Sequence, residues 1–132
     1  MLNTAPGIVV TPRETTQPFV LLVKTSVGWG IPIGQEGETF PTLLSRIATE
    51  LLVPGNTLQL SSNRHKTISA ENAELNVELA VCDRAELRPF LESNEWYDAR
   101  FSSFEEASYI MHASQSKLLH WCERVVPKAL AA

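Results

Sequence analysis

The spacing of hydrophobic residues predicts strands and helices in alternation. Residues 18–25, PFVLLVKT, form a continuous apolar run, which is typical of a strand covered on both faces. From Phe40 to Leu51 apolar residues recur at the three- and four-residue intervals of one helix face. Thr39 can cap this helix, and the Pro-Gly pair at 54–55 ends it. The apolar stripe consists of Phe40, Leu43, Leu44, Ile47, Ala48 and Leu51.

The second half of the chain predicts further strands and a long helical segment. Residues 75–82 alternate between apolar and polar positions, as a strand does. Residues 104–126 follow helical spacing, with an interruption expected around Ser114 and Ser116. The intervening stretch 61–73 is too polar to assign. This order of elements favours an α+β fold with a mixed β-sheet between helices.

Length and composition narrow the class of protein. A chain of 132 residues suits a single domain, 1–132. Its 11 Lys and Arg residues are scattered and the formal net charge is -4, which argues against nucleic acid as a partner. No apolar run approaches the ~18 residues of a membrane span, and the first residues lack the pattern of a secretory signal. We therefore expect a cytoplasmic protein without a membrane partner. Cys82 and Cys122 are isolated, which predicts two reduced, buried thiols.

Three segments resemble parts of the Nudix hydrolases, a family that cleaves nucleoside diphosphates linked to another group. PFVLLVKTSVGWGIP (18–32) resembles the family's strand and W-x-x-P turn. GQEGET (34–39), followed by an amphipathic helix, resembles the loop and helix of the Nudix box. EWYDARFSSFEEA (95–107) resembles the segment that precedes the last helix. The resemblance implies a Nudix-like α/β/α sandwich.

The family's box reads glycine, five residues, glutamate, seven residues, then Arg-Glu-apolar-x-Glu-Glu-x-Gly. With Glu38 as the first glutamate, Arg46 matches the arginine and Glu50 matches one later glutamate. Ile47 and Leu51, however, occupy the other two positions at which the family has metal-binding glutamates. The box is therefore degenerate in this chain.

The resemblance implies Mg²⁺ or Mn²⁺ as cofactor if the chain is active, and no cofactor otherwise. Such an ion needs several oxygen ligands, and Glu50 alone makes a weak site. Glu36 and Glu38 can complete a rearranged site with it. The competing interpretation pairs Glu50 with Arg46 on a solvated helix face and places the two loop glutamates in a polar turn.

Two residues are candidates for contact with a substrate. Trp29 and Gly34 lie in the glycine-rich stretch before the helix, and a tryptophan can stack on a nucleobase. Trp96 has the same capacity, although tryptophans in small domains more often lie in the core. Gly34 stands closer to Glu38 than the family spacing requires, so the loop is shortened.

Three functions are compatible with these observations. The favoured one is a Nudix-like domain without standard hydrolysis that binds a nucleotide-like ligand, a protein partner or a second copy of itself as a homodimer. The alternative is a metal-dependent hydrolase of nucleoside diphosphate derivatives, with Glu50, Glu38 and Arg46 as catalytic residues and Glu50, Glu38 and Glu36 as metal ligands. In that case Glu74 or Glu78 can add a carboxylate from the strand at 75–82. The third is an unrelated α+β interaction domain.

Overall fold

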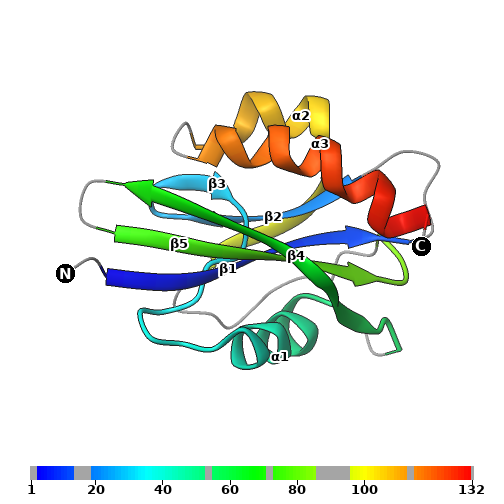
Figure 1. The fold of residues 1–132 in the computed structure, drawn as a ribbon, viewed down its shortest axis with the longest axis horizontal. Helices are drawn as coiled ribbons and strands as arrows, with labels where there is room; N and C mark the ends of the chain where they lie inside the picture. Colours follow the sequence, from blue (N-terminus) through cyan, green and yellow to red (C-terminus); the bar gives the residue numbers. More distant parts are fainter. Residues whose placement is uncertain are drawn as a thin grey trace.

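Helices cover both faces of a central β layer, and this arrangement confirms the predicted α/β/α sandwich (Figure 1). The computed structural model describes residues 3–13, 19–52, 55–70, 73–85, 96–112 and 115–131. Helix α1 (Phe40–Leu51) covers one face, and α2 (Phe104–Ile110) and α3 (Ser116–Ala131) cover the other. The strands are β1 (Asn3–Pro12), β2 (Phe19–Thr25), β3 (Gly28–Gly30), β4 (Leu58–Ala70), β5 (Ala73–Cys82) and β6 (Asp98–Ser103).

The β layer consists of two three-stranded sheets. In the first, with the order β1-β5-β4, β1 and β5 are parallel and β4 is antiparallel to β5. In the second, with the order β3-β2-β6, all pairs are antiparallel. A bridge between Gly7 and Ile33 and a 3.1 Å hydrogen bond from Ile8 N to Pro32 O tie β1 to the segment after β3.

The predicted double coverage of β2 is confirmed. Leu21 and Val23 belong to the core cluster that α1 covers, whereas Val20 and Leu22 belong to the cluster that α2 and α3 cover. All four side chains are buried. Alternate residues of this strand therefore connect the two hydrophobic cores of the sandwich.

Helix α1 begins where the sequence predicts. The Thr39 hydroxyl accepts a 3.3 Å hydrogen bond from Thr42 N, which satisfies one exposed amide of the first turn. Leu43, Ile47 and Leu51 form the buried face, as the stripe predicts.

The helical pattern at 104–126 divides into α2 and α3, as the interruption near Ser116 predicts. Ser103 caps α2, since its hydroxyl accepts a 3.1 Å hydrogen bond from Glu106 N. Met111 is extended and ends the helix. None of the described helices is both long and apolar enough to cross a membrane.

The polar stretch that could not be assigned is largely strand. β4 runs to Ala70, with a register shift against β5 between Leu60 and His65. The backbone ladder to β5 holds it, and the Thr67 hydroxyl adds a 3.0 Å bond to Asn76 Oδ1. A strand paired in this way does not need the apolar alternation by which strands are recognised in a sequence.

The cysteines are free and buried, in agreement with the predicted reduced thiols. Burial raises the pKa of the Cys82 thiol and that of the Cys122 thiol to about 12. Both side chains are therefore neutral parts of the core.

Candidate functional site

Glu38 and Arg46 join the loop before α1 to the helix itself. Arg46 donates from Nε to Glu38 Oε2 at 3.0 Å and from Nη2 to Oε1 at 2.8 Å, and Gln35 N also donates to Oε1 at 2.8 Å. Only 10% of the Glu38 side chain is exposed. Both carboxylate oxygens are thus engaged by donors, and the loop is fixed against the helix.

The Arg46 guanidinium also lies over the Trp96 ring, 5.1 Å from its centroid. A cation at this distance is attracted to the face of the indole. Arg46 therefore links the loop, the helix and the residue that leads into β6.

Gly34 packs against this ion pair. Its amide donates a 2.8 Å bond to Pro6 O, and a Cβ at this position would lie 2.6 Å from Glu38 Oε1. Glycine is required here because the carboxylate and β1 approach the backbone so closely. The predicted role of Gly34 in substrate binding stays a prediction, and the structure places it in the packing of the shortened loop.

Ile47 and Leu51 lie inside the core. Neither has any exposed surface, and both belong to the cluster that contains Leu21, Val23 and Trp96. The helix face that carries Ile47 and Leu51 is therefore filled by hydrophobic packing among the described residues.

The candidate metal ligands do not come together. Glu36 is exposed in the loop, whereas Glu50 is partly buried in the last turn of α1. Mg²⁺ needs its oxygen ligands at about 2.0–2.1 Å. No group of three or more His, Cys, Asp or Glu side chains in the described residues could hold a metal, so the donors present do not fit Mg²⁺ or Mn²⁺.

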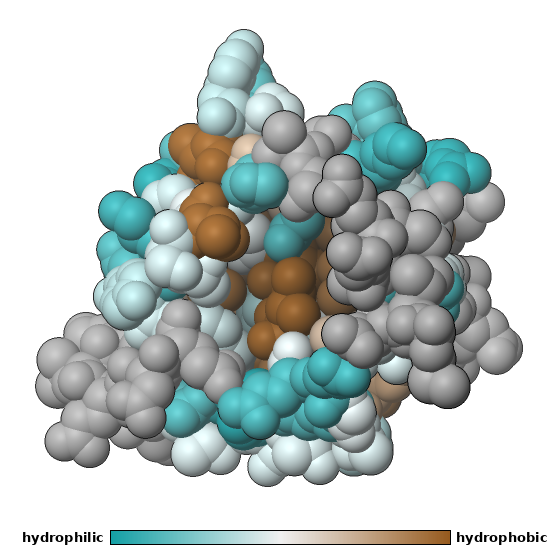
Figure 2. Space-filling view, turned by 90° about the vertical axis from the view of Figure 1, so that its left-hand side faces the viewer, coloured by the Kyte–Doolittle hydropathy of each residue, from teal (hydrophilic) through white to brown (hydrophobic). Residues whose placement is uncertain are grey.

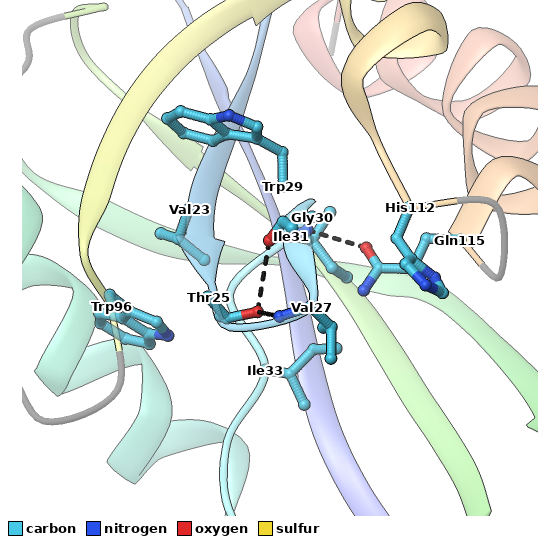
Figure 3. A pocket seen from close by; sticks show the side chains of 11 residues that line it. Val23, Thr25, Val27, Trp29, Gly30, Ile31, Ile33, Trp96, His112 and Gln115 are labelled. Atoms are coloured by element: carbon cyan, nitrogen blue, oxygen red, sulfur yellow. Dashed lines mark hydrogen bonds between the residues drawn. The ribbon is translucent and has the colours of Figure 1, made fainter.

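A separate cavity lies at the end of the molecule that carries the β2–β3 turn. It has a volume of about 280 Å³ and lies between the β2–β3 hairpin, Trp96 and the connection from α2 to α3 (Figure 3). Figure 2 shows this end, where hydrophobic residues gather in a hollow between hydrophilic ones. The apolar wall is formed by Val23, Val27, Ile31, Ile33, Trp29 and Trp96. The predicted contact residue Trp29 thus lines a cavity.

Backbone and side-chain hydrogen bonds close the other side of this cavity. His112 N donates to Trp29 O at 2.8 Å, and Ile31 N donates to Gln115 Oε1 at 2.9 Å. Lys, Arg, Asp and Glu are absent from the described residues that line the cavity. It therefore suits an uncharged group better than a phosphate.

Gln115 was not among the residues singled out from the sequence. It lies 84 residues from Ile31, and it belongs to a segment where only an interruption of the helical pattern is visible. No local sequence feature indicates a contact over that separation.

Comparisons with known proteins support the fold. The chain matches no protein-family model and no curated protein sequence. Among solved structures, the Ap4A hydrolase of C. elegans in a binary complex is similar with a TM-score of 0.73 and 20% identity, over 94% of this chain and 98% of that one. The NUDIX domain of Shewanella oneidensis NrtR complexed with ADP ribose gives 0.67 and 13%, over 96% and 89%.

A third similar structure comes from the complex between the C-terminal domain of mouse MUTYH and human PCNA. The likeness has a TM-score of 0.60 and 18% identity, and covers 96% of this chain and 91% of that one. Likeness at these identities establishes architecture rather than activity. The chain has the Nudix fold.

Proposed function

We propose that this chain is a Nudix-fold binding domain that holds a small nucleotide-like ligand and lacks the metal-dependent hydrolysis of the fold's enzymes. The observation that carries the proposal is the complete burial of Ile47 and Leu51 at two positions of the box that are glutamates in the family. A buried aliphatic side chain supplies neither charge nor an oxygen ligand to a cation.

The remaining acidic residues do not compensate for this loss. The Glu38 carboxylate is held by the Arg46 guanidinium and by Gln35 N. A metal ion would have to displace the guanidinium from Glu38, at the cost of leaving that cation without its carboxylate. Glu50 would then be left as a single helical carboxylate, which is a weak magnesium site.

Binding is supported by the uncharged cavity of about 280 Å³. This volume is just below the range of about 300–1,000 Å³ typical of drug-sized ligands, so it suits one ring system rather than a whole dinucleotide. Trp29 supplies aromatic surface of the kind on which planar rings stack, whereas Trp96 is almost fully buried and has the Arg46 guanidinium over its ring. The similar NrtR domain is complexed with ADP ribose, a ligand of this chemical class.

A protein partner is the second candidate, because a similar chain occurs in the complex between MUTYH and PCNA. A second copy of this chain is a special case of the same candidate. The exposed side chains of Val27, Tyr97 and Tyr109 provide apolar surface for such a contact.

The test combines turnover with binding. The protein is incubated with Mg²⁺ or Mn²⁺ and a panel that includes ADP-ribose and Ap4A, and phosphate-containing products are measured; nucleoside binding is then measured by quenching of tryptophan fluorescence. We expect binding without turnover. Turnover that Glu50→Gln abolishes would establish the rearranged hydrolase instead. An absence of ligand binding, with a mass that rises with protein concentration, would favour self-association.

A further inference from the structure

We infer that Gln115 selects the ligand of the cavity by presenting an amide N–H to it, and that the preferred ligand is an uncharged planar heterocycle with a ring carbonyl. This inference rests on the proposed function, namely that the cavity holds a ligand. It concerns the chemical class of that ligand, which the fold does not specify.

The orientation of the Gln115 carboxamide is determined by its partner. Ile31 N lies 2.9 Å from the Gln115 side chain, and a backbone N–H can only donate, so the facing atom is the oxygen Oε1. The amide nitrogen Nε2 must then point away from Ile31. Figure 3 shows the oxygen directed at Ile31 and the nitrogen on the other side of the group.

The carboxamide is also held in place. A Cβ on Gly30 would lie 2.6 Å from Gln115 Oε1 and 2.7 Å from Nε2, so the group packs directly on the glycine backbone. Gln115 N donates to His112 O at 2.9 Å, and His112 N donates to Trp29 O at 2.8 Å. A donor fixed in this way loses little conformational entropy when a ligand binds.

The amide nitrogen Nε2 carries two N–H groups that can donate hydrogen bonds. Within the described residues, no hydrogen-bond acceptor is found for it, whereas Oε1 has Ile31 N. A ligand that enters the cavity displaces water from Nε2 and must replace that hydrogen bond, because an amide N–H left unpaired in an apolar site is costly. A ring carbonyl accepts such a bond, whereas an exocyclic amino group at the same place sets donor against donor.

The other lining residues favour a neutral ring. The apolar wall and the Trp29 indole suit a flat ring, and no acidic or basic side chain, with the exception of His112, is among the described lining residues. Phosphate groups of a ligand would therefore remain outside this cavity. The recognised part is the ring, so nucleosides without phosphate are suitable probes.

The experiment compares inosine with adenosine, which differ at C6, a carbonyl against an amino group, and at the adjacent N1, which carries a hydrogen only in inosine. Dissociation constants are measured by calorimetry for the unaltered protein and for Gln115→Glu, in which an acceptor oxygen takes the place of Nε2. We expect inosine to bind about tenfold more tightly to the unaltered protein, the size expected for one hydrogen bond. In Gln115→Glu the preference should disappear or invert.

A matched variant controls for the change of charge. Gln59→Glu makes the same substitution at an exposed position of β4 outside the cavity lining, and it should keep the preference for inosine. If Gln115→Glu does not fold, Gly30→Ala replaces it, since the added Cβ displaces the carboxamide and should abolish the discrimination.

The outcomes separate the inference from the proposed function. Equal affinities for both nucleosides, unchanged in Gln115→Glu, would overturn the role of Gln115 and leave binding intact. Binding of neither nucleoside would overturn both.

Discussion

The Arg46 guanidinium holds the Glu38 carboxylate through two hydrogen bonds, of 3.0 Å from Nε and 2.8 Å from Nη2. The pair spans the glycine-rich loop and α1. This contact has a structural purpose, because it holds the loop on the helix through side chains of the protein alone.

The first prediction follows from this pair. Glu38→Gln should lower the free energy of unfolding by about 1–3 kcal/mol, because Arg46 loses a charged acceptor in a partly buried position. Urea denaturation measures the change. Glu36→Gln, at an exposed position of the same loop, serves as the control and should stay within about 0.5 kcal/mol of the unaltered protein. Equal effects of the two substitutions would show that the ion pair contributes nothing specific.

The second prediction concerns the buried face of α1. Ile47→Glu should lower the free energy of unfolding by at least about 3 kcal/mol, or prevent folding, since it places a carboxylate at a position with no exposed surface. Ile47→Val should cost only about 0.5–1.5 kcal/mol. Thermal and urea denaturation measure the change in the free energy of unfolding for each variant.

The matched control for that series is Ser45→Glu, an exposed position on the same helix, which should change stability little. The double variant Ile47→Glu/Leu51→Glu restores the charges of the family pattern, yet should gain no turnover with Mg²⁺. A folded double variant that hydrolyses Ap4A would contradict the view that this face is core rather than site.

The third prediction concerns a buried hydroxyl. Thr11 has no exposed surface, and within the described residues its Oγ1 has no hydrogen-bond partner. Thr11→Val keeps the shape and removes the unpaired group, so the free energy of unfolding should rise by about 1 kcal/mol. Thr11→Ser keeps the hydroxyl and loses the methyl group, and should lower it. If the urea midpoints of Thr11→Val and Thr11→Ser shifted in the same direction, the unpaired hydroxyl would not explain the change.

The fourth prediction is a dependence on alkaline pH. The pKa of each buried thiol, in Cys82 and Cys122, is raised by burial from 9.0 to about 12. Below pH 9 the thiols are neutral in both the folded and the unfolded chain, and their contribution is fully present. Between pH 9 and 12 only the unfolded chain loses these protons, so the free energy of unfolding should fall as the pH rises.

Urea denaturation at pH 7, 9 and 10.5 measures this loss. The variant Cys82→Ala/Cys122→Ala removes both thiols and should lose less stability over the same interval, even though its stability at pH 7 is lower. The comparison with this variant is needed because lysines and tyrosines also titrate between pH 9 and 12 and can lower the stability of both proteins. Identical losses in the two proteins would rule out the thiols as its source.

The sequence predicted best those elements whose pattern is local. The double-sided apolar run of β2 and the stripe of α1 each report burial directly, because every second or every third to fourth residue faces a core. The match of Glu38 with Arg46 was also visible, since their spacing of eight residues follows the family box. The Nudix-like architecture could be predicted from these features together.

The parts that could not be predicted depend on partners far away in the chain. The polar stretch in β4 forms a strand because β5 offers a backbone ladder, and nothing in its own composition indicates this. The cavity is a stronger case, since the contact from Ile31 to Gln115 crosses 84 residues. The glycines of the loop likewise suggested a site, whereas Gly34 serves close packing against Glu38.

The tie between Ile31 and Gln115 has a consequence for the order in which the molecule is completed. Ile31 is synthesised 84 residues before Gln115, so an emerging chain contains β2, β3 and α1 before it contains the residue that closes one side of the cavity. The wall that closes the hollow is therefore completed last, and a chain truncated before residue 115 would lack both Gln115 and helix α3, whose Leu118, Cys122 and Val126 are buried in one of the two cores.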